Sequence, residues 1–468
     1  MIMKGDPQHR ITKDDDRRNV RGHRVTVVGA ARSGMAAARL LQAQAATVFV
    51  TDHAAIDDSR RTILTGAGIE FEEGGHTNRA LDADYMVTSP GVPDSARVLI
   101  RAVERRLPIY SEIEVAAWFC DAPIIAVTGT NGKTTTTSLI GHIFRTDGKT
   151  THVAGNIGKP FSAVVAKIDR TDVVVLEVSS FQLDHIDSFR PRVSVLLNIT
   201  PDHMDRYGDE LGEYTESKFR IRENQQSDDV FIYNLDDEQI TSRLRAMNRS
   251  SRPTSYGYTL SDTPSAAGFI HDEALIIQTG ANKEVLMQSD ELALRGRHNT
   301  GNSLAAAIAA RVMEVRSEIV RASLSSFEGV PHRLEFVREV DGIRYVNDSK
   351  ATNVNAVWFA LESMNQPVVL IAGGRDKGND YESLRELVAD KVRILLSIGE
   401  SAEKVADELG SCVEQTVMAD SMAEAVSYAS LLARNGETVL LSPACSSFDM
   451  FDDFEERGDA FKRLVSDL

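Results

Sequence analysis

The apolar positions of the chain fall into short runs separated by longer stretches of mixed polarity. The first run, Arg24–Val28, is typical of a buried strand. A helix-like segment at Met35–Gln44 follows, then a second apolar run at Thr47–Thr51, and Met86–Pro90 has the pattern of a strand that ends in a turn. Because short apolar runs alternate with helical stretches, the pattern indicates βαβ units and a parallel sheet.

The same alternation restarts twice further along the chain. Residues 228–290 differ, because short β-like pieces there are separated by polar turns, which predicts a smaller sheet packed onto the central domain. Asn302–Val315 is rich in alanine and predicts a helix. The remaining expected strands are Ile124–Thr128, Asp172–Leu176 and Val193–Asn198 in the second series, and Ile343–Val346, Val368–Ala372, Arg393–Ile398 and Thr438–Ser442 in the third.

A chain of 468 residues is too long for one hydrophobic core, so we expect several domains of the α/β class. We expect a disordered tail at 1–21, because this segment is crowded with charge and lacks the apolar run of a signal peptide. The three domains that follow are expected at 22–111 (Rossmann-like), 112–329 (P-loop ATPase-like with the small extra sheet) and 330–468 (Rossmann-like).

The net charge and the positions of the cysteines exclude several classes of function. The formal net charge is −17, which repels nucleic acid and anionic lipid, so we expect neither as a partner. The sequence also lacks an apolar run long enough to cross a membrane. The three cysteines are scattered, which indicates neither a disulfide framework nor a zinc site and suggests a cytoplasmic protein.

The segment Thr128–Thr134 reads Thr-Gly-Thr-Asn-Gly-Lys-Thr and lies between a predicted strand and a predicted helix. Glycines there let backbone N–H groups face a phosphate, and the helix N-terminus adds a positive dipole. Lys133 is then expected to reach the outer phosphates and Thr134 to hold Mg²⁺. The strict G-x-x-x-x-G-K-[ST] pattern fails, because its first glycine falls on Val127.

Two further strand ends carry candidate metal ligands. Glu177 closes the expected strand that ends at Leu176, and a carboxylate at the carboxyl edge of a parallel sheet is placed to bind Mg²⁺ through a hard oxygen. His203 follows the next strand, between Asp202 and Asp205. Read alone, each of these residues could equally be structural.

The loop Gly129–Lys133 resembles the variant phosphate loop of the muramyl ligases and the related folylpolyglutamate synthases, and the resemblance extends from about residue 24 to the C-terminus. It implies an ATP-dependent ligase with two Mg²⁺ sites. It further implies that His203 ligates the second Mg²⁺ and that Lys218 carries a carbamate formed with CO₂. The expected catalytic residues are Lys133, Lys218, His203, Lys350 and Arg333, and the expected metal ligands are Thr134, Glu177, His203 and Lys218.

The same resemblance implies the substrate contacts. For ATP they are Gly129, Thr130, Asn131, Gly132, Lys133, Thr134, Thr135, Asn299, Asn302, Arg333 and Asp348. For the UDP-linked substrate they are Ser33, Gly34, Asp52, Gly91, Asn156 and His203, although His53 stands where relatives often place an arginine. For the incoming amino acid they are Thr352, Lys377, Ser447, Phe448 and Phe454, with Lys377 suited to pair with a carboxylate.

The stretches Ser442–Asp449 and Asp348–Asn353 point to the D-glutamate-adding member of the family. The implied partners are the small molecules UDP-N-acetylmuramoyl-L-alanine and D-glutamate, the implied role is in peptidoglycan synthesis, and we expect a monomer. Three alternatives stay open: a folylpolyglutamate synthase, a non-catalytic nucleotide-binding protein, and an NAD-dependent oxidoreductase. The last rests only on Gly29–Gly34, where Ala31 replaces the middle glycine of the dinucleotide fingerprint.

Overall fold

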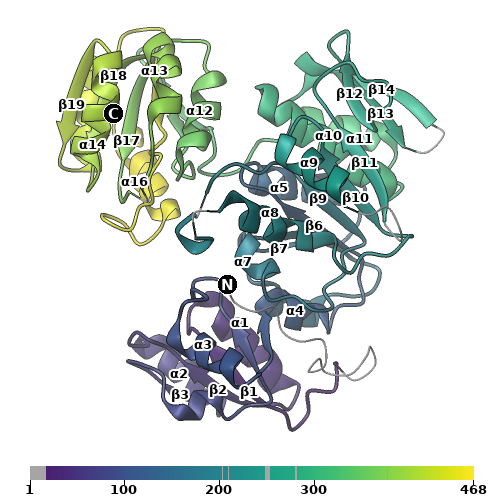
Figure 1. The fold of residues 1–468 in the computed structure, drawn as a ribbon. Helices are drawn as coiled ribbons and strands as arrows, with labels where there is room; N and C mark the ends of the chain where they lie inside the picture. Colours follow the sequence, from purple (N-terminus) through teal and green to yellow (C-terminus); the bar gives the residue numbers. More distant parts are fainter. Residues whose placement is uncertain (1–16, 203, 209, 248–252, 280–281, 377) are drawn as a thin grey trace. The chain divides into compact units, whose positions relative to one another are not determined.

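The computed structural model of the chain describes residues 17–202, 204–208, 210–247, 253–279, 282–376 and 378–468. The chain forms two compact units, one reaching to Leu286 and including Leu304–Ser323, the other made of Met287–Ser303 and Leu324–Leu468. Figure 1 shows three sheets, each flanked by helices, which is the three-domain α/β fold that the alternating pattern predicts. In the part of the chain that is described, no helix has both the length and the apolar character needed to cross a membrane.

The first sheet has the strand order β3-β2-β1-β4-β5 and is parallel throughout. The strand order reverses between β1 and β4, so a crevice is expected outside the carboxyl ends of these two strands. The strands are β1 (Arg24–Val28), β2 (Thr47–Thr51), β3 (Glu70–Glu72), β4 (Tyr85–Thr88) and β5 (Ile109–Ser111), and the helices are α1 (Arg32–Ala43), α2 (Asp58–Gly66), α3 (Arg97–Glu104) and α4 (Glu112–Ala117).

The central sheet contains nine strands in the order β14-β13-β12-β11-β10-β9-β6-β8-β7. Its strands are β6 (Ile124–Thr128), β7 (Thr151–Gly155), β8 (Val173–Glu177), β9 (Val193–Leu196), β10 (Val230–Asn234), β11 (Thr254–Tyr258), β12 (Gly268–His271), β13 (Ala274–Thr279) and β14 (Asn282–Gln288). Its helices are α5 (Lys133–Thr146), α6 (Phe161–Val164), α7 (Ser180–Leu183), α8 (Leu211–Phe219), α9 (Glu238–Ala246), α10 (Arg297–Val312) and α11 (Ser317–Ser326). Helices α1 and α4 pack against α6, so one apolar core runs from the first sheet's helices into the central domain.

The extra strands of residues 228–290 differ from the expectation in how they attach. Strands β10 and β11 extend the parallel sheet, and β12 joins β11 through a single residue pair, Tyr258 with Gly268. From there β12 and β13 run antiparallel. These strands therefore do not form a separate smaller sheet, because the pairing of β11 with β12 makes them the edge of the nine-stranded central sheet.

The third sheet has the order β15-β16-β20-β17-β18-β19, in which only β15 runs antiparallel to its neighbour. The strands are β15 (Glu335–Val340), β16 (Ile343–Asn347), β17 (Val368–Gly373), β18 (Val392–Ile398), β19 (Gln415–Ala419) and β20 (Thr438–Leu441). The helices are α12 (Val354–Glu362), α13 (Arg385–Lys391), α14 (Ala402–Leu409), α15 (Met422–Leu432) and α16 (Phe454–Ser466).

The predicted boundary of the disordered tail, at residue 21, lies too late in the sequence. Val20 is buried in the core of the first sheet. Arg17 forms ion pairs with Glu114 at 3.4 Å and with Asp187 at 2.6 Å. Glu114 is a fully buried carboxylate, which needs positive charge and hydrogen-bond donors around it, and Arg17 supplies both. These contacts fix residues 17–21 to the fold. Residues 1–16 lie outside the described part of the chain.

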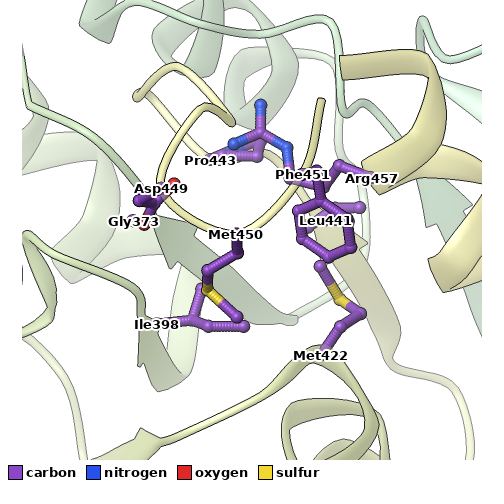
Figure 2. Close-up of a pocket in the computed structure, with 10 residues that line it drawn as sticks. Gly373, Ile398, Met422, Leu441, Pro443, Asp449, Met450, Phe451 and Arg457 are labelled. Atoms are coloured by element: carbon purple, nitrogen blue, oxygen red, sulfur yellow. The ribbon is translucent and has the colours of Figure 1, made fainter. Parts of the chain in front are cut away.

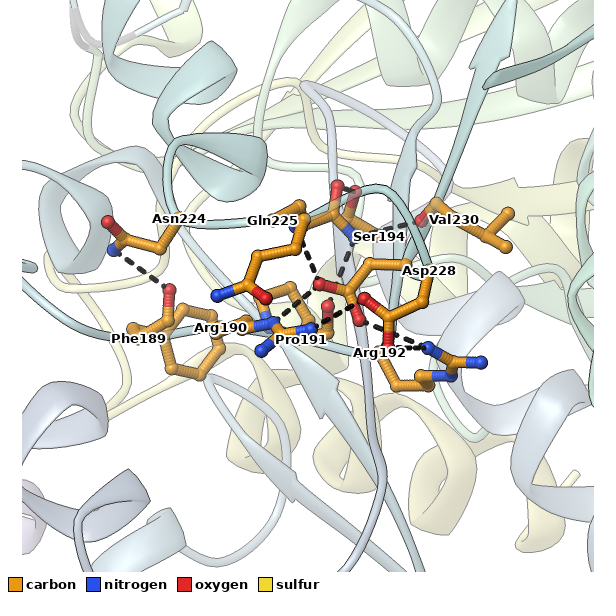
Figure 3. A network of polar contacts seen from close by, with 11 residues as sticks. Phe189, Arg190, Pro191, Arg192, Ser194, Asn224, Gln225, Asp228 and Val230 are labelled. Atoms are coloured by element: carbon orange, nitrogen blue, oxygen red, sulfur yellow. Dashed lines mark hydrogen bonds and ion pairs between the residues drawn. The ribbon is translucent and has the colours of Figure 1, made fainter. Parts of the chain in front are cut away.

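A polar network at the amino end of β9 and β10 joins the segments that lead into these strands (Figure 3). Arg190 donates to Asp229 at 2.5 Å and to Asp228 at 2.9 Å, and Arg192 donates to Asp228 at 2.8 Å. Gln225 donates to the carbonyls of Pro191 and Val230. The two carboxylates differ in environment, since the Asp229 side chain is 2% exposed and that of Asp228 is 63% exposed.

We expect Asp229→Asn to lower the free energy of unfolding by about 2–4 kcal/mol, because a buried carboxylate is lost and Arg190 Nε loses its charged acceptor. Asp228→Asn is the matched control and should change the same free energy by less than about 1 kcal/mol, since exposed ion pairs contribute little. Urea unfolding of both variants measures the difference. Equal effects of the two substitutions would show that burial does not set the strength of this network.

Candidate active site

The phosphate-loop segment lies between β6 and α5, as the sequence pattern predicts. Gly129 and Gly132 both have positive φ, 154° and 82°, a backbone region that other residues rarely adopt. A Cβ atom on Gly129 would also lie 3.0 Å from Cβ of Leu197. The loop therefore requires glycine at both positions, and its backbone can approach a ligand closely before α5 begins at Lys133.

Lys133 folds back over this loop. Its Nζ donates to the carbonyl of Gly129 at 2.9 Å and to that of Thr130 at 2.7 Å. Since both acceptors belong to the loop itself, the ammonium group lies beside the backbone that would surround a phosphate. The lysine is half-buried, which leaves its charge able to interact strongly with an anion there.

Asn198, which the sequence reasoning did not single out, holds the phosphate loop from the neighbouring strand end. Its side-chain oxygen accepts from the backbone N–H groups of Thr130 at 3.1 Å and Asn131 at 2.8 Å, and its Nδ2 donates to the carbonyl of Asn131 at 3.0 Å. The signal available in the sequence was its place at the end of a predicted strand.

Thr134, Glu177 and Asn156 come together at the carboxyl ends of β6, β8 and β7. Thr134 Oγ1 donates to Oε2 of Glu177 at 2.7 Å, and Asn156 Nδ2 donates to its Oε1 at 3.1 Å. Glu177 is buried, yet these partners are uncharged. A buried carboxylate and a hydroxyl beside a phosphate loop form the hard-oxygen donor set that Mg²⁺ prefers, so these residues fit the expected metal.

Lys218 is fully buried, on α8, close to the same loop. Its Nζ donates to the carbonyl of Gly129 at 2.7 Å and lies 4.4 Å from the ring centroid of Tyr214. Burial lowers the pKa of Lys218 well below its ordinary value, and the positive charge of Lys133 acts in the same direction. Two lysines thus share one carbonyl oxygen, an arrangement that disfavours keeping both amines protonated.

Two expected site residues, His203 and Lys377, lie outside the described residues. Within the ranges that the structure does describe, no group of three or more His, Cys, Asp or Glu side chains is arranged to hold a metal ion. Thr134, Glu177 and Lys218 are therefore the members of the expected metal set that the structure describes.

The carboxyl edge of the first sheet brings together the turn after β1 and the ends of β2 and β4. Asp52 accepts from the backbone N–H of Ala30 at 2.6 Å, and Ser89 Oγ donates to the carbonyl of Gly29 at 3.0 Å. A Cβ on Gly34 would fall 1.8 Å from that same carbonyl oxygen, so α1 packs closely against the turn only because residue 34 is glycine. Ser33 lies half-buried on the first turn of α1.

Arg206 is a second residue that the sequence reasoning missed. Its guanidinium donates to the carbonyls of Pro90 at 2.8 Å and Val92 at 2.6 Å, the two residues on either side of Gly91. Its Cζ also lies 4.3 Å from the ring centroid of Phe181. Arg206 therefore fixes the exposed Gly91 turn to the segment that follows β9.

In the third sheet, Arg333 and Asp348 form an ion pair at 3.6 Å, with Asp348 fully buried. Burial raises the pKa of Asp348, while Arg333 and the hydroxyl of Ser442 act against that rise. Lys350 Nζ lies 4.2 Å from the ring centroid of Phe454. Several expected residues thus meet at the carboxyl end of β16, at the start of α16.

The other expected residues of this domain differ in exposure. Ser447 is buried and Phe448 is 61% exposed. Thr352 is half-buried, and its backbone N–H donates to the carbonyl of Lys350 at 2.9 Å. Asn299 and Asn302, both buried on α10, are linked by a side-chain hydrogen bond of 3.2 Å.

Family models match each of the three domains of the chain separately. Residues 24–98 match the family model of the MurD N-terminal domain, residues 127–310 that of the Mur ligase middle domain, and residues 332–445 that of the Mur ligase glutamate ligase domain. Among solved structures, UDP-N-acetylmuramate-alanine ligase MurC from Thermotoga maritima is 19% identical with a TM-score of 0.59, covering 95% of this chain and 100% of that one. MurF from Acinetobacter baumannii is 15% identical with a TM-score of 0.60, covering 95% and 93%. At such identities the likeness concerns the fold alone.

Curated relatives are much closer in sequence. A protein of Salinibacter ruber is 55% identical over 98% of this chain and 100% of its own length, and one of Chlorobium phaeobacteroides is 46% identical over 96% and 99%. A third, from Bacteroides fragilis, is 45% identical over 95% and 100%. All three are named UDP-N-acetylmuramoylalanine–D-glutamate ligase. With matches of this extent across all three domains, the chain belongs to the Mur ligase family, in the group of UDP-N-acetylmuramoylalanine–D-glutamate ligases.

Proposed function

We propose that the protein is an ATP-dependent ligase that joins D-glutamate to UDP-N-acetylmuramoyl-L-alanine in peptidoglycan precursor synthesis. The observation that carries this proposal is the 55% identity, over 98% of the chain, to a relative of that name. The arrangement of Lys133, Glu177 and Lys218 around one phosphate loop supports it, because nucleotide binding alone does not need a buried carboxylate and a buried lysine there.

The proposed reaction has two steps. A carboxylate oxygen of the muramoyl-alanine attacks the γ-phosphorus of ATP, the bond to the ADP oxygen breaks, and an acyl-phosphate forms. The amine of D-glutamate, having lost a proton, then attacks the acyl carbon; the amide bond forms and phosphate leaves. In such phosphoryl transfers the protein contributes positioning and charge stabilisation more than covalent chemistry.

Each domain has a proposed part in this reaction. Residues 22–111 would bind the uridine diphosphate at Ser33, Gly34, Asp52 and Gly91, residues 112–329 the ATP, and residues 330–468 the D-glutamate. Lys133, Arg333 and Lys350 would stabilise the charge of the transferred phosphoryl group, while Lys377, Ser447 and Phe454 would contact the amino acid. His203 and Asn156 would also lie near the UDP-linked substrate.

The metal ions belong to this proposal as well. Thr134 and Glu177 would hold one Mg²⁺, and His203 with a carbamate on Lys218 would help to hold a second. When bound, these ions would neutralise phosphate charge. Burial of Lys218 beside Lys133 supports the carbamate, because CO₂ reacts with a neutral amine and the product replaces a like-charge contact by an attractive one. We further propose that the enzyme acts as a monomer in the cytoplasm, in keeping with its small-molecule substrates.

Phosphate release from Mg-ATP with UDP-N-acetylmuramoyl-L-alanine tests the proposal, with D-glutamate, L-glutamate, L-alanine and diaminopimelate compared as acceptors. We expect release only with D-glutamate, and a product heavier by one glutamyl residue in mass spectrometry. Release with another amino acid would reassign the substrate within the family. Absence of release with all four would contradict the proposed reaction, and a tightly bound nicotinamide cofactor would favour the oxidoreductase alternative.

A further inference from the structure

Arg457, on the first turn of α16, has a buried charge that the proposed reaction does not use. The residue is 3% exposed, and burial lowers the pKa of its guanidinium to about 10, so the group is still protonated at neutral pH. A positive charge at a helix N-terminus is also opposed by the helix dipole. Both effects destabilise an arginine at this position, so helix stability does not account for it.

The hydrogen bonds of Arg457 join two loops that carry expected substrate contacts. We call Asp348–Asn353 the lysine loop and Ser442–Asp449 the serine–cysteine loop. Arg457 Nε donates to Oγ of Ser349 at 3.0 Å, and Nη2 donates to the carbonyls of Ser349 at 2.8 Å and Cys445 at 3.1 Å. Ser349 Oγ in turn donates to the carbonyl of Phe454 at 2.8 Å. One side chain thus links both loops to the start of α16.

The serine–cysteine loop needs such a restraint. Ala444 has a φ of 61°, a left-handed conformation that a residue with a Cβ adopts only under constraint. Its carbonyl accepts from Asn379 Nδ2 at 3.1 Å, and the next carbonyl, that of Cys445, accepts from Arg457. Arg457 therefore contributes to holding a strained segment that leads directly to Ser447.

The remaining surroundings of Arg457 favour a role within the protein over direct ligand contact. Nη1 is buried and has no hydrogen-bond partner among the described residues, and it would lie 3.2 Å from a Cβ on Gly374. Arg457 lines a small pocket with mainly apolar side chains such as Pro443, Met450 and Phe451 (Figure 2). Nε and Nη2 donate to acceptors of the protein itself, so most of the hydrogen bonds of the guanidinium serve a role within the domain.

We infer that Arg457 is a positioning residue that holds Lys350, Ser447 and Phe454 in one fixed arrangement, so that the acceptor amino acid is bound beside the lysine loop. This inference rests on the proposed function. The planar guanidinium is required because it donates in three fixed directions, whereas a lysine ammonium on a flexible chain cannot bridge both loops in the same way. Replacing Arg457 should therefore impair the binding and turnover of D-glutamate and leave the binding of ATP largely unchanged.

Arg457→Lys tests this, with separate measurement of kcat and of KM for each substrate. We expect KM for D-glutamate to rise at least about tenfold and kcat to fall at least about tenfold, while KM for ATP changes less than about threefold. Arg393→Lys is the matched control, because Arg393 is also an interior-facing arginine of this domain but pairs with Glu437 away from these loops. It should leave KM for D-glutamate unchanged.

Ser349→Ala supplies an independent variant should Arg457→Lys fold poorly, since it removes the Ser349 Oγ that accepts from Arg457 and donates to the carbonyl of Phe454. It should raise KM for D-glutamate when introduced into the wild-type protein. When introduced into Arg457→Lys it should cause a smaller further rise, because the two side chains act through one contact. An unchanged KM for D-glutamate in both variants, or equal rises for ATP and D-glutamate, would overturn the positioning role. A wild-type protein that releases no phosphate with D-glutamate would instead refute the proposed function.

Discussion

Lys133→Ala is expected to lower kcat/KM for D-glutamate-dependent phosphate release by at least about a hundredfold, the scale seen when one preorganised charge donor is removed from a transition state. The ammonium group lies beside the two glycine-containing turns of the phosphate loop, where the transferred phosphoryl group would develop its charge. Steady-state phosphate release and ATP-analogue titration together separate a loss of turnover from a loss of binding.

The fold should tolerate this substitution. Lys133 donates to carbonyls of its own loop, four and three residues earlier, and its removal also takes away a positive charge beside the buried Lys218. Lys149→Ala is the matched control, because Lys149 is exposed just beyond the other end of α5. It should keep near-normal turnover. Near-normal turnover in Lys133→Ala as well would remove the phosphate-loop assignment.

Lys218→Ala is expected to be inactive, and short carboxylates such as acetate should restore part of its activity by taking the place of the carbamate. In wild-type protein, removal of dissolved CO₂ should lower activity reversibly, and added bicarbonate should restore it. Burial and Lys133 lower the pKa of Lys218, so the neutral amine that reacts with CO₂ becomes more abundant as pH rises, and reactivation should be faster at higher pH.

Lys218→Arg separates a structural from a chemical role of the lysine, because arginine keeps a cation but forms no carbamate. It should be inactive and should not respond to bicarbonate. Carbon-13 bicarbonate should give a carbamate carbonyl signal in NMR of wild-type protein only. Full activity of Lys218→Ala, or an identical signal in both proteins, would contradict the carbamate.

Local structure was largely predictable from the sequence. Runs such as Ile124–Thr128 and Val368–Ala372 are buried strands because uninterrupted apolar residues need cover on both faces of a parallel sheet. The loop from Gly129 to Lys133 was also predictable, since glycine, lysine and hydroxyl residues at fixed spacing between a strand and a helix are typical of phosphate-binding loops. These features depend on residues that lie close together in the sequence.

Contacts between distant segments were not predictable in the same way. The edge-to-edge attachment of β12 to β11 depends on one backbone pair, which leaves no pattern in side-chain polarity. Asn198, Arg206 and Arg457 each bind backbone carbonyls or amides of another segment, and such targets carry no sequence signature. Likewise, nothing in the helix pattern around Lys218 indicates that its amine meets the carbonyl of Gly129.

The sequence by itself therefore determined the α/β class, the alternation of strands and helices, and the phosphate loop, because hydrophobic period, glycine and helix-start chemistry act over a few residues. Short strands such as β3, β5 and β7 were not among the expected elements. Only the tertiary structure decided which strand ends converge and which side chains become buried against like charge, as in the pair of Lys133 and Lys218. Burial and electrostatic coupling arise when distant segments pack. They turn a lysine that composition alone would place on a solvated helix face into one with a lowered pKa beside the phosphate-loop segment.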